Sequence, residues 1–142
     1  LLSRRQRQMC IRDSYKRMGG LVGGTVTNNN LRIEYCTNNG NVFSQLGCRT
    51  GGFVGHNQAT IVGCVNKGTI LANITYASGE PQHGPGWACG YSGKKLVTQC
   101  AKGGRVGEWD TYKDNPGSAP EATNDNALCY KNGDYFDPSQ NY

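Results

Sequence analysis

The chain has 142 residues and carries 15 lysines and arginines against 10 aspartates and glutamates, so its formal net charge at pH 7 is +5. Its 21 glycines are roughly twice the ordinary share, and the residues that favour helices are sparse and scattered. No long apolar segment is present, so the sequence predicts no membrane span within these residues.

The N-terminal segment, residues 1–14, is interpreted as an artefactual or disordered leader. Residues 4–13 match, codon by codon, the translated adapter of a transposon-based sequencing library, and such segments are set aside before the fold is considered. Excluding them removes Cys10, four arginines and one aspartate, which reduces the net charge to +2. This basic arm is the only pattern in the chain that is typical of nucleic-acid binding, so we expect no nucleic-acid partner.

The most informative feature of the remaining chain is a unit that occurs three times, aliphatic-x-x-Cys-x-x-x-Gly-x-aliphatic. The repeated positions are Ile33, Cys36, Gly40 and Val42; then Ile61, Cys64, Gly68 and Ile70; then Val97, Cys100, Gly104 and Val106. We expect the first aliphatic residue and the cysteine to point into a shared interior. The glycine is expected to lie at a sharp turn, and the second aliphatic residue to begin the next strand.

A glycine-rich block precedes each unit, over residues 19–23, 51–55 and 86–90. The first two read Gly-Gly-aliphatic or aromatic-Val-Gly, whereas the third has Trp87 in place of the second glycine and Cys89 in place of the valine. Each block is too short for a helix and predicts one short strand bounded by residues that are free to take positive φ.

One such unit cannot bury its apolar face alone, and about three stacked units are the usual minimum for a stable repeat array. The sequence therefore predicts an all-β fold, a short parallel β-helix or β-solenoid of about three irregular turns over residues 15–107. Residues 108–142, which are richer in proline and aspartate, are expected to form an irregular C-terminal cap or a linker.

The blocks and units together resemble the GLUG-motif repeat family of bacterial secreted and cell-surface proteins, most clearly over Gly19–Gly23 with Ile33–Val42. The resemblance covers Gly19–Val106 and weakens in the third unit. It implies a β-helix-like solenoid, an extracellular or outer-cell-surface location and a structural or adhesive role. It brings no catalytic residues with it.

The repeated cysteines favour a ladder of buried free thiols, because equivalent positions of a solenoid stack about 4.8 Å apart. Disulfides between rungs and a Cys48–Cys89 bridge remain alternatives, and the state of Cys129 is open. The sequence has no Cys-x-x-Cys pair and its two histidines are isolated, so it predicts no metal site and no cofactor. His56 is expected to be a solvent-facing turn residue.

The longest insertion between units, residues 72–86, is the expected ligand surface, because loops on a rigid scaffold tend to carry binding. The candidate residues are Tyr76, Glu80, His83 and the adjacent Trp87. Trp87 has two interpretations, an indole packed over the edge of the solenoid or an aromatic platform for a sugar ring.

These patterns predict a non-catalytic structural or adhesive repeat module rather than an enzyme. The alternatives are a carbohydrate-active β-helix of the polysaccharide lyase or glycosidase type, and a glycan-binding adhesin. The glutamates do not recur at matched positions, so no catalytic carboxylate pair is suggested. A host glycan, an extracellular protein and neighbouring repeats of a longer chain are the expected partners.

Overall fold

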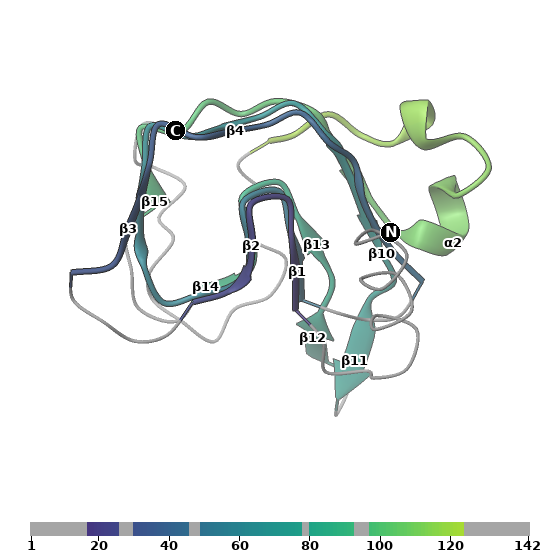
Figure 1. The fold of residues 1–142 in the computed structure, drawn as a ribbon. Coiled ribbons are helices and arrows are strands. Elements are labelled where there is room, and N and C mark those ends of the chain that lie inside the picture. Colours follow the sequence, from purple (N-terminus) through teal and green to yellow (C-terminus); the bar gives the residue numbers. More distant parts are fainter. Residues whose placement is uncertain (1–16, 26–29, 46–48, 78–79, 93–96, 124–142) are drawn as a thin grey trace, which may run out of the picture.

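The computed structural model describes residues 17–25, 30–45, 49–77, 80–92 and 97–123, which form an all-β solenoid of three stacked coils. Figure 1 looks nearly along the stacking axis, so that the traces of successive coils overlie one another. Parallel pairing joins each coil to the next, and none of the sheets closes into a barrel.

In the residues that the structure describes, the first two coils each contain five short strands. The first coil comprises β1 (Arg17–Gly19), β2 (Val22–Gly24), β3 (Arg32–Glu34), β4 (Thr37–Asn38) and β5 (Val42–Ser44). The second comprises β6 (Arg49–Gly51), β7 (Val54–Asn57), β8 (Thr60–Val62), β9 (Val65–Asn66) and β10 (Thr69–Ala72).

The third coil follows an antiparallel hairpin of β11 (Thr75–Ala77) and β12 (Glu80–His83). It comprises β13 (Pro85–Gly86), β14 (Cys89–Ser92), β15 (Val97–Thr98) and β16 (Arg105–Gly107). In place of a fourth strand pair, Ala101 forms a single parallel bridge with Val65.

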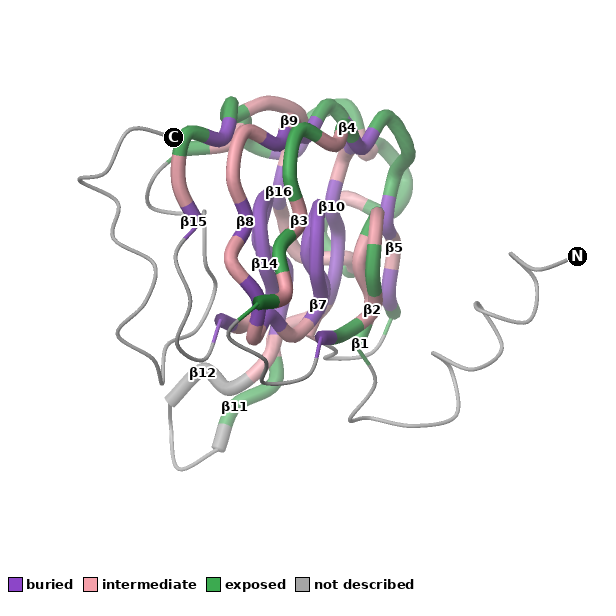
Figure 2. The backbone as a smooth tube through the Cα atoms, turned by 60° about the vertical axis from the view of Figure 1, so that its left-hand side comes forward, coloured by how far each residue is buried: buried purple, intermediate pink, exposed green. Residues whose placement is uncertain are grey.

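The core consists of columns of apolar side chains from equivalent positions. The register aligns Ile33, Ile61 and Val97 in one column, Val42, Ile70 and Val106 in a second, and Val54 and Cys89 in a third, where the aligned Val22 of the first coil is exposed. Residues of the middle coil such as Ile61 and Ile70 are fully buried, whereas Ile33 is only partly buried. Figure 2 shows the same trend, with buried stretches in β7 and β10 and exposed ones in the first coil.

The glycine-rich blocks differ from the sequence-based expectation of one short strand. Each block is a tight turn between two strands, such as β6 and β7, that face one another inside the coil (Figure 1). The glycines permit backbone contact rather than positive φ. A Cβ on Gly55 would lie 2.6 Å from the carbonyl oxygen of Arg49, closer than any side chain tolerates.

The repeated glycines after the cysteines also have a different role from the one predicted. A Cβ on Gly68 would overlap the carbonyl oxygen of Gly40 in the coil before it, and one on Gly104 would overlap that of Gly68. Of the three repeated glycines, only Gly104 has positive φ. The sharp corner instead lies one residue before each cysteine, where the left-handed residues are Tyr35, Gly63 and Gln99, with φ of 53°, 66° and 54°.

The segment after the third coil folds back against the solenoid. It contains α2 (Trp109–Tyr112) and η1 (Pro116–Ser118) and lies outside β10 in Figure 1. The Trp109 ring packs against Phe43 with centroids 5.6 Å apart, and Glu121 forms an antiparallel bridge with Arg105. Within the described part of the chain, no helix is long and apolar enough to cross a membrane.

Candidate ligand-binding site

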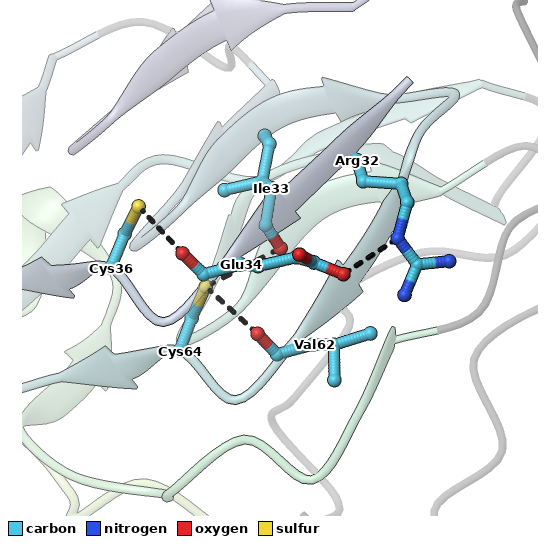
Figure 3. A network of polar contacts seen from close by, with 6 residues as sticks. All are labelled: Arg32, Ile33, Glu34, Cys36, Val62 and Cys64. Carbon is cyan, nitrogen blue, oxygen red and sulfur yellow. Dashed lines mark hydrogen bonds and ion pairs between the residues drawn. The ribbon is translucent and has the colours of Figure 1, made fainter. Parts of the chain in front are cut away.

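The repeated cysteines form a column in which each thiol bonds within its own coil, and the thiol of Cys64 also bonds to the coil before it. The Cys36 carbonyl accepts a hydrogen bond from the backbone N–H of Val65, and the Cys64 carbonyl accepts one from that of Ala101, both at 2.9 Å. These bonds join each coil to the next. Each thiol donates to the carbonyl two residues before it: Cys36 to Glu34, Cys64 to Val62 and Cys100 to Thr98, at 3.3–3.6 Å. Figure 3 shows the first two of these contacts, with a further one from Cys64 to the Ile33 carbonyl.

The thiols of the described residues are structural. Cys36, Cys64, Cys89 and Cys100 are free, which argues against the predicted alternative of disulfides between rungs. Burial raises the pKa of Cys100 to about 11 and that of Cys89 well above its usual value, so neither is a thiolate at neutral pH. Cys48 and Cys129 lie outside the described residues.

A second column, of asparagines two residues after the cysteines, was missed by the sequence analysis. Asn38 donates to the side-chain oxygen of Asn66 at 2.9 Å, and Asn66 donates to the carbonyls of Gly68 and Gly103. Each side-chain oxygen also accepts from the backbone of the glycine two residues on. Because both asparagines are buried, these bonds satisfy groups that would otherwise be costly.

A similar polar column follows the glycine-rich blocks. Asn57 is fully buried and donates to the hydroxyl of Ser92 at 3.2 Å and to the carbonyl of Ala59 at 2.7 Å. Thr25 of the first coil lies on the other side and contacts the Asn57 oxygen at 3.5 Å. The sequence signal for this column is weak, because three different residue types share it.

Trp87 does not belong to the expected ligand surface, and its interpretation as a platform for a sugar ring is wrong. The indole is 0% exposed, stands edge-on to Phe53 at 5.9 Å between centroids, and donates from Nε1 to the Thr123 carbonyl at 3.0 Å. It lies in the core because Trp87 is part of the tight turn between β13 and β14, at the position that Gly52 holds in the second coil. A ligand cannot reach it without unfolding that turn.

The other expected ligand residues lie on the β11–β12 hairpin. Tyr76 on β11 is 59% exposed, and Glu80 pairs with Ala77 across the hairpin. His83 ends β12 and is half-buried against Arg49, whose Nε donates to its Nδ1 at 3.2 Å. Of the expected ligand residues on the hairpin, His83 is therefore the one that contacts the solenoid, through Arg49 of β6.

His83 belongs to a group that the sequence analysis did not assemble, here called the Arg49 cluster: Arg17, Arg49, His56, His83 and Tyr91. The Arg49 guanidinium lies over the Tyr91 ring, 4.3 Å from its centroid, and its Nη1 is 2.7 Å from His56 Nδ1. The His56 and Tyr91 rings meet edge to face at 4.8 Å. His56 is thus a half-buried strand residue of β7, not the solvent-facing turn residue that was expected.

Burial, together with the charges of the nearby arginines, keeps both histidines of the cluster neutral. Burial and then the charges of Arg17 and Arg49 lower the pKa of His56 to about 4, and burial and Arg49 lower that of His83. Since arginine only donates, Nδ1 of His56 accepts from Arg49 and Nε2 carries the proton. The amide nitrogen of Gln58 lies 3.0 Å from that Nε2. When the side-chain amide is turned over, its oxygen accepts a hydrogen bond from Nε2–H.

A second polar hollow lies between the third coil and the segment that follows it. It has a volume of about 400 Å³ and is lined by Lys67, Thr69, Lys102, Gly104, Arg105 and Glu121, among others. Its arginine is already used by the protein: Arg105 donates to the Ala119 carbonyl at 2.6 Å and lies 3.8 Å from the Glu121 carboxylate. This hollow is therefore a weaker candidate for an anionic ligand than the Arg49 cluster.

The described residues hold no group of three or more histidines, cysteines or carboxylates placed to bind a metal ion. The chain matches no protein-family model, and it is significantly similar to no curated protein and to no solved structure.

Proposed function

We propose that this chain is a non-catalytic structural or adhesive repeat module of a bacterial protein that is secreted or displayed on the outer cell surface. The observation that carries the proposal is the use of polar side chains along the stack. Asn38, Asn66 and Asn57 are buried and bond to neighbouring coils. Such side chains extend a scaffold from coil to coil, and they are not available to a substrate.

The family resemblance of the repeats supports the same role. The Gly-Gly-Leu-Val-Gly block and the Ile-x-x-Cys unit of the first coil are the parts that resemble GLUG repeats. An oxidising location is compatible with three of the four described thiols, since Cys64, Cys89 and Cys100 are fully buried and out of reach of an oxidant.

An activity screen separates the proposal from a carbohydrate-active enzyme. The full chain is incubated with polygalacturonate, alginate and heparin, and the release of reducing ends and of unsaturated uronates is followed. We expect no release above a protein-free control. Turnover that disappears in His83→Ala would contradict the proposal and favour a lyase or glycosidase.

The complete gene is the direct test of location. We expect it to encode an export signal and further copies of the cysteine-glycine unit. A gene that instead joins these coils to a cytosolic enzyme, with neither an export signal nor further copies, would overturn the proposal.

A further inference from the structure

The two arginines of the Arg49 cluster lie in register on neighbouring coils. Arg17 of β1 pairs with Arg49 of β6, and parallel strands lie about 4.8 Å apart. Like charges at adjacent positions of a sheet are unfavourable unless something compensates them. Among the residues that the structure describes, the carboxylates in ion pairs are Glu34 and Glu121, and neither pairs with Arg17 or Arg49.

The wall opposite these arginines shapes the space around them. Gly24, His56 and Tyr91 align on β2, β7 and β14. The Arg17 side chain lies against Gly24, where a Cβ would be 3.0 Å from its Cδ and 3.4 Å from its Nη1. The missing side chain at Gly24 gives the exposed Arg17 guanidinium a place beside His56.

Arg49 is held in one orientation before any ligand arrives. Tyr91 lies under its guanidinium plane, and Nε and Nη1 are bonded to the two neutral histidines. No acceptor in the described part of the chain is bonded to Nη2. A guanidinium fixed in this way loses little further freedom on binding an oxyanion, which favours affinity.

We propose that Arg17 and Arg49 together bind the carboxylate or sulfate groups of an acidic polysaccharide. This inference rests on the proposed function and gives the adhesive role a ligand class. The site lies on a column that runs along the stacking axis, which suits a linear polyanion. Arg49 already covers a face of Tyr91, so that ring is a poor platform for stacked bases. These features favour a glycan over a nucleic acid.

The test measures binding of the full chain to immobilised heparin, which carries sulfate and carboxylate groups, and to polygalacturonate, which carries carboxylates alone. Dextran serves as the neutral reference. We expect retention on one or both acidic polymers and none on dextran. Removing a guanidinium that makes charge-assisted bonds should weaken binding about tenfold, so we expect that loss in Arg49→Gln and a further loss in Arg17→Gln/Arg49→Gln.

A matched variant controls for charge alone. Arg32→Gln/Lys113→Gln removes two positive charges from exposed positions outside the Arg49 cluster and should change the affinity less than about twofold. Arg49→Lys keeps the charge but loses the planar fork, so it should bind nearly as weakly as Arg49→Gln. Arg17 is exposed, and Arg17→Gln keeps the test valid if substitution of the half-buried Arg49 disturbs the fold.

Three results would overturn the inference. One is retention that survives Arg17→Gln/Arg49→Gln, and another is retention that is lost in Arg32→Gln/Lys113→Gln instead. The third is single-stranded DNA that binds at least as tightly with the same dependence on Arg49. Lack of binding without turnover ends this inference alone, whereas polysaccharide turnover ends the proposed function.

Discussion

At the scale of single residues, we expect the loss of the small Asn66 side chain to lower the free energy of unfolding strongly. It accepts from Asn38 and donates to the carbonyls of Gly68 and Gly103 while fully buried. Asn66→Ala leaves several of these groups without a partner. We expect the free energy of unfolding to fall by roughly 2–4 kcal/mol, measured by denaturant titration.

The neighbouring asparagine of the first coil provides the control. Asn39 is exposed, and Asn39→Ala should change the free energy of unfolding by less than about 0.5 kcal/mol. Equal effects of the two substitutions would show that the asparagine column does not stabilise the stack.

His56 gives the fold a dependence on pH that can be isolated. Its pKa is about 4 in the folded chain and near 6.5 when unfolded, so the unfolded chain takes up a proton first as the pH falls. The stability linked to His56 is therefore complete above about pH 6.5 and is lost as the pH falls towards 4. Because the ring is half in water, we expect a loss below about 1 kcal/mol.

His56→Gln tests this dependence, since glutamine can still accept from Arg49 but does not titrate. The difference in unfolding free energy between His56→Gln and the parent chain, followed by denaturant titration from pH 7 to pH 4, should favour the variant increasingly at low pH. A difference that stays constant over this range would mean that His56 does not carry a lowered pKa.

At the scale of elements, the irregular third block has a packing explanation. In the first two coils an asparagine side chain faces a block glycine: a Cβ on Gly52 would lie 2.7 Å from Cγ of Asn66, and Gly20 faces Asn38 in the same way. The third coil has Lys102 in place of the asparagine and Trp87 in place of the glycine. The coil that lacks the asparagine is thus the coil that accommodates a large side chain at the turn.

The repeated glycine four residues after each cysteine has two possible explanations, a local turn that requires glycine or close contact between stacked coils. Substitutions of Gly40 and Gly68 distinguish them. Gly40 and Gly68 hold the same motif position, but a Cβ on Gly40 would meet Asn38 at an ordinary 3.6 Å, whereas one on Gly68 would overlap the Gly40 carbonyl. We expect Gly40→Ala to change the melting temperature little. Gly68→Ala should lower the unfolding free energy by about 3 kcal/mol or prevent folding, because the backbone of one coil must move.

Comparable losses from the two substitutions would support the sequence-based interpretation, in which a turn requires glycine at both positions. A gain in Gly40→Ala of a few tenths of a kcal/mol is consistent with the stacking account, since alanine restricts the unfolded chain.

At the scale of the whole molecule, the stacking could be predicted and the cross-section could not. The all-β solenoid and the alignment of Ile33, Ile61 and Val97 follow from fixed offsets, because equal spacing places equal residues in one column. The inward turn of each coil depends on how closely two backbones approach at Gly55, which the sequence shows only as glycine content. The Arg49 cluster joins four separate strands and a hairpin, so no local pattern identifies it.

The coils of the stack should differ in how readily they unfold locally, and the reactivity of the cysteine thiols shows which coil has unfolded. Cys36 lies in the first coil and is half-buried, whereas Cys64 and Cys100 are fully buried within the second and third coils. Burial raises the pKa of both Cys64 and Cys100, so they react only after the coil opens. We expect N-ethylmaleimide at pH 8 to modify Cys36 before Cys64 and Cys100, with each site followed by peptide mass spectrometry.

The dependence on denaturant then identifies the opening unit. Modification of Cys64 and Cys100 should slow together in stabilising conditions and accelerate together with denaturant, because both coils share one core and open in the global unfolding step. Cys36 should respond weakly to denaturant, since opening the first coil exposes little additional surface. Coils that open independently would instead give Cys64 and Cys100 different denaturant dependences, and the continuous columns would then not act as one cooperative unit.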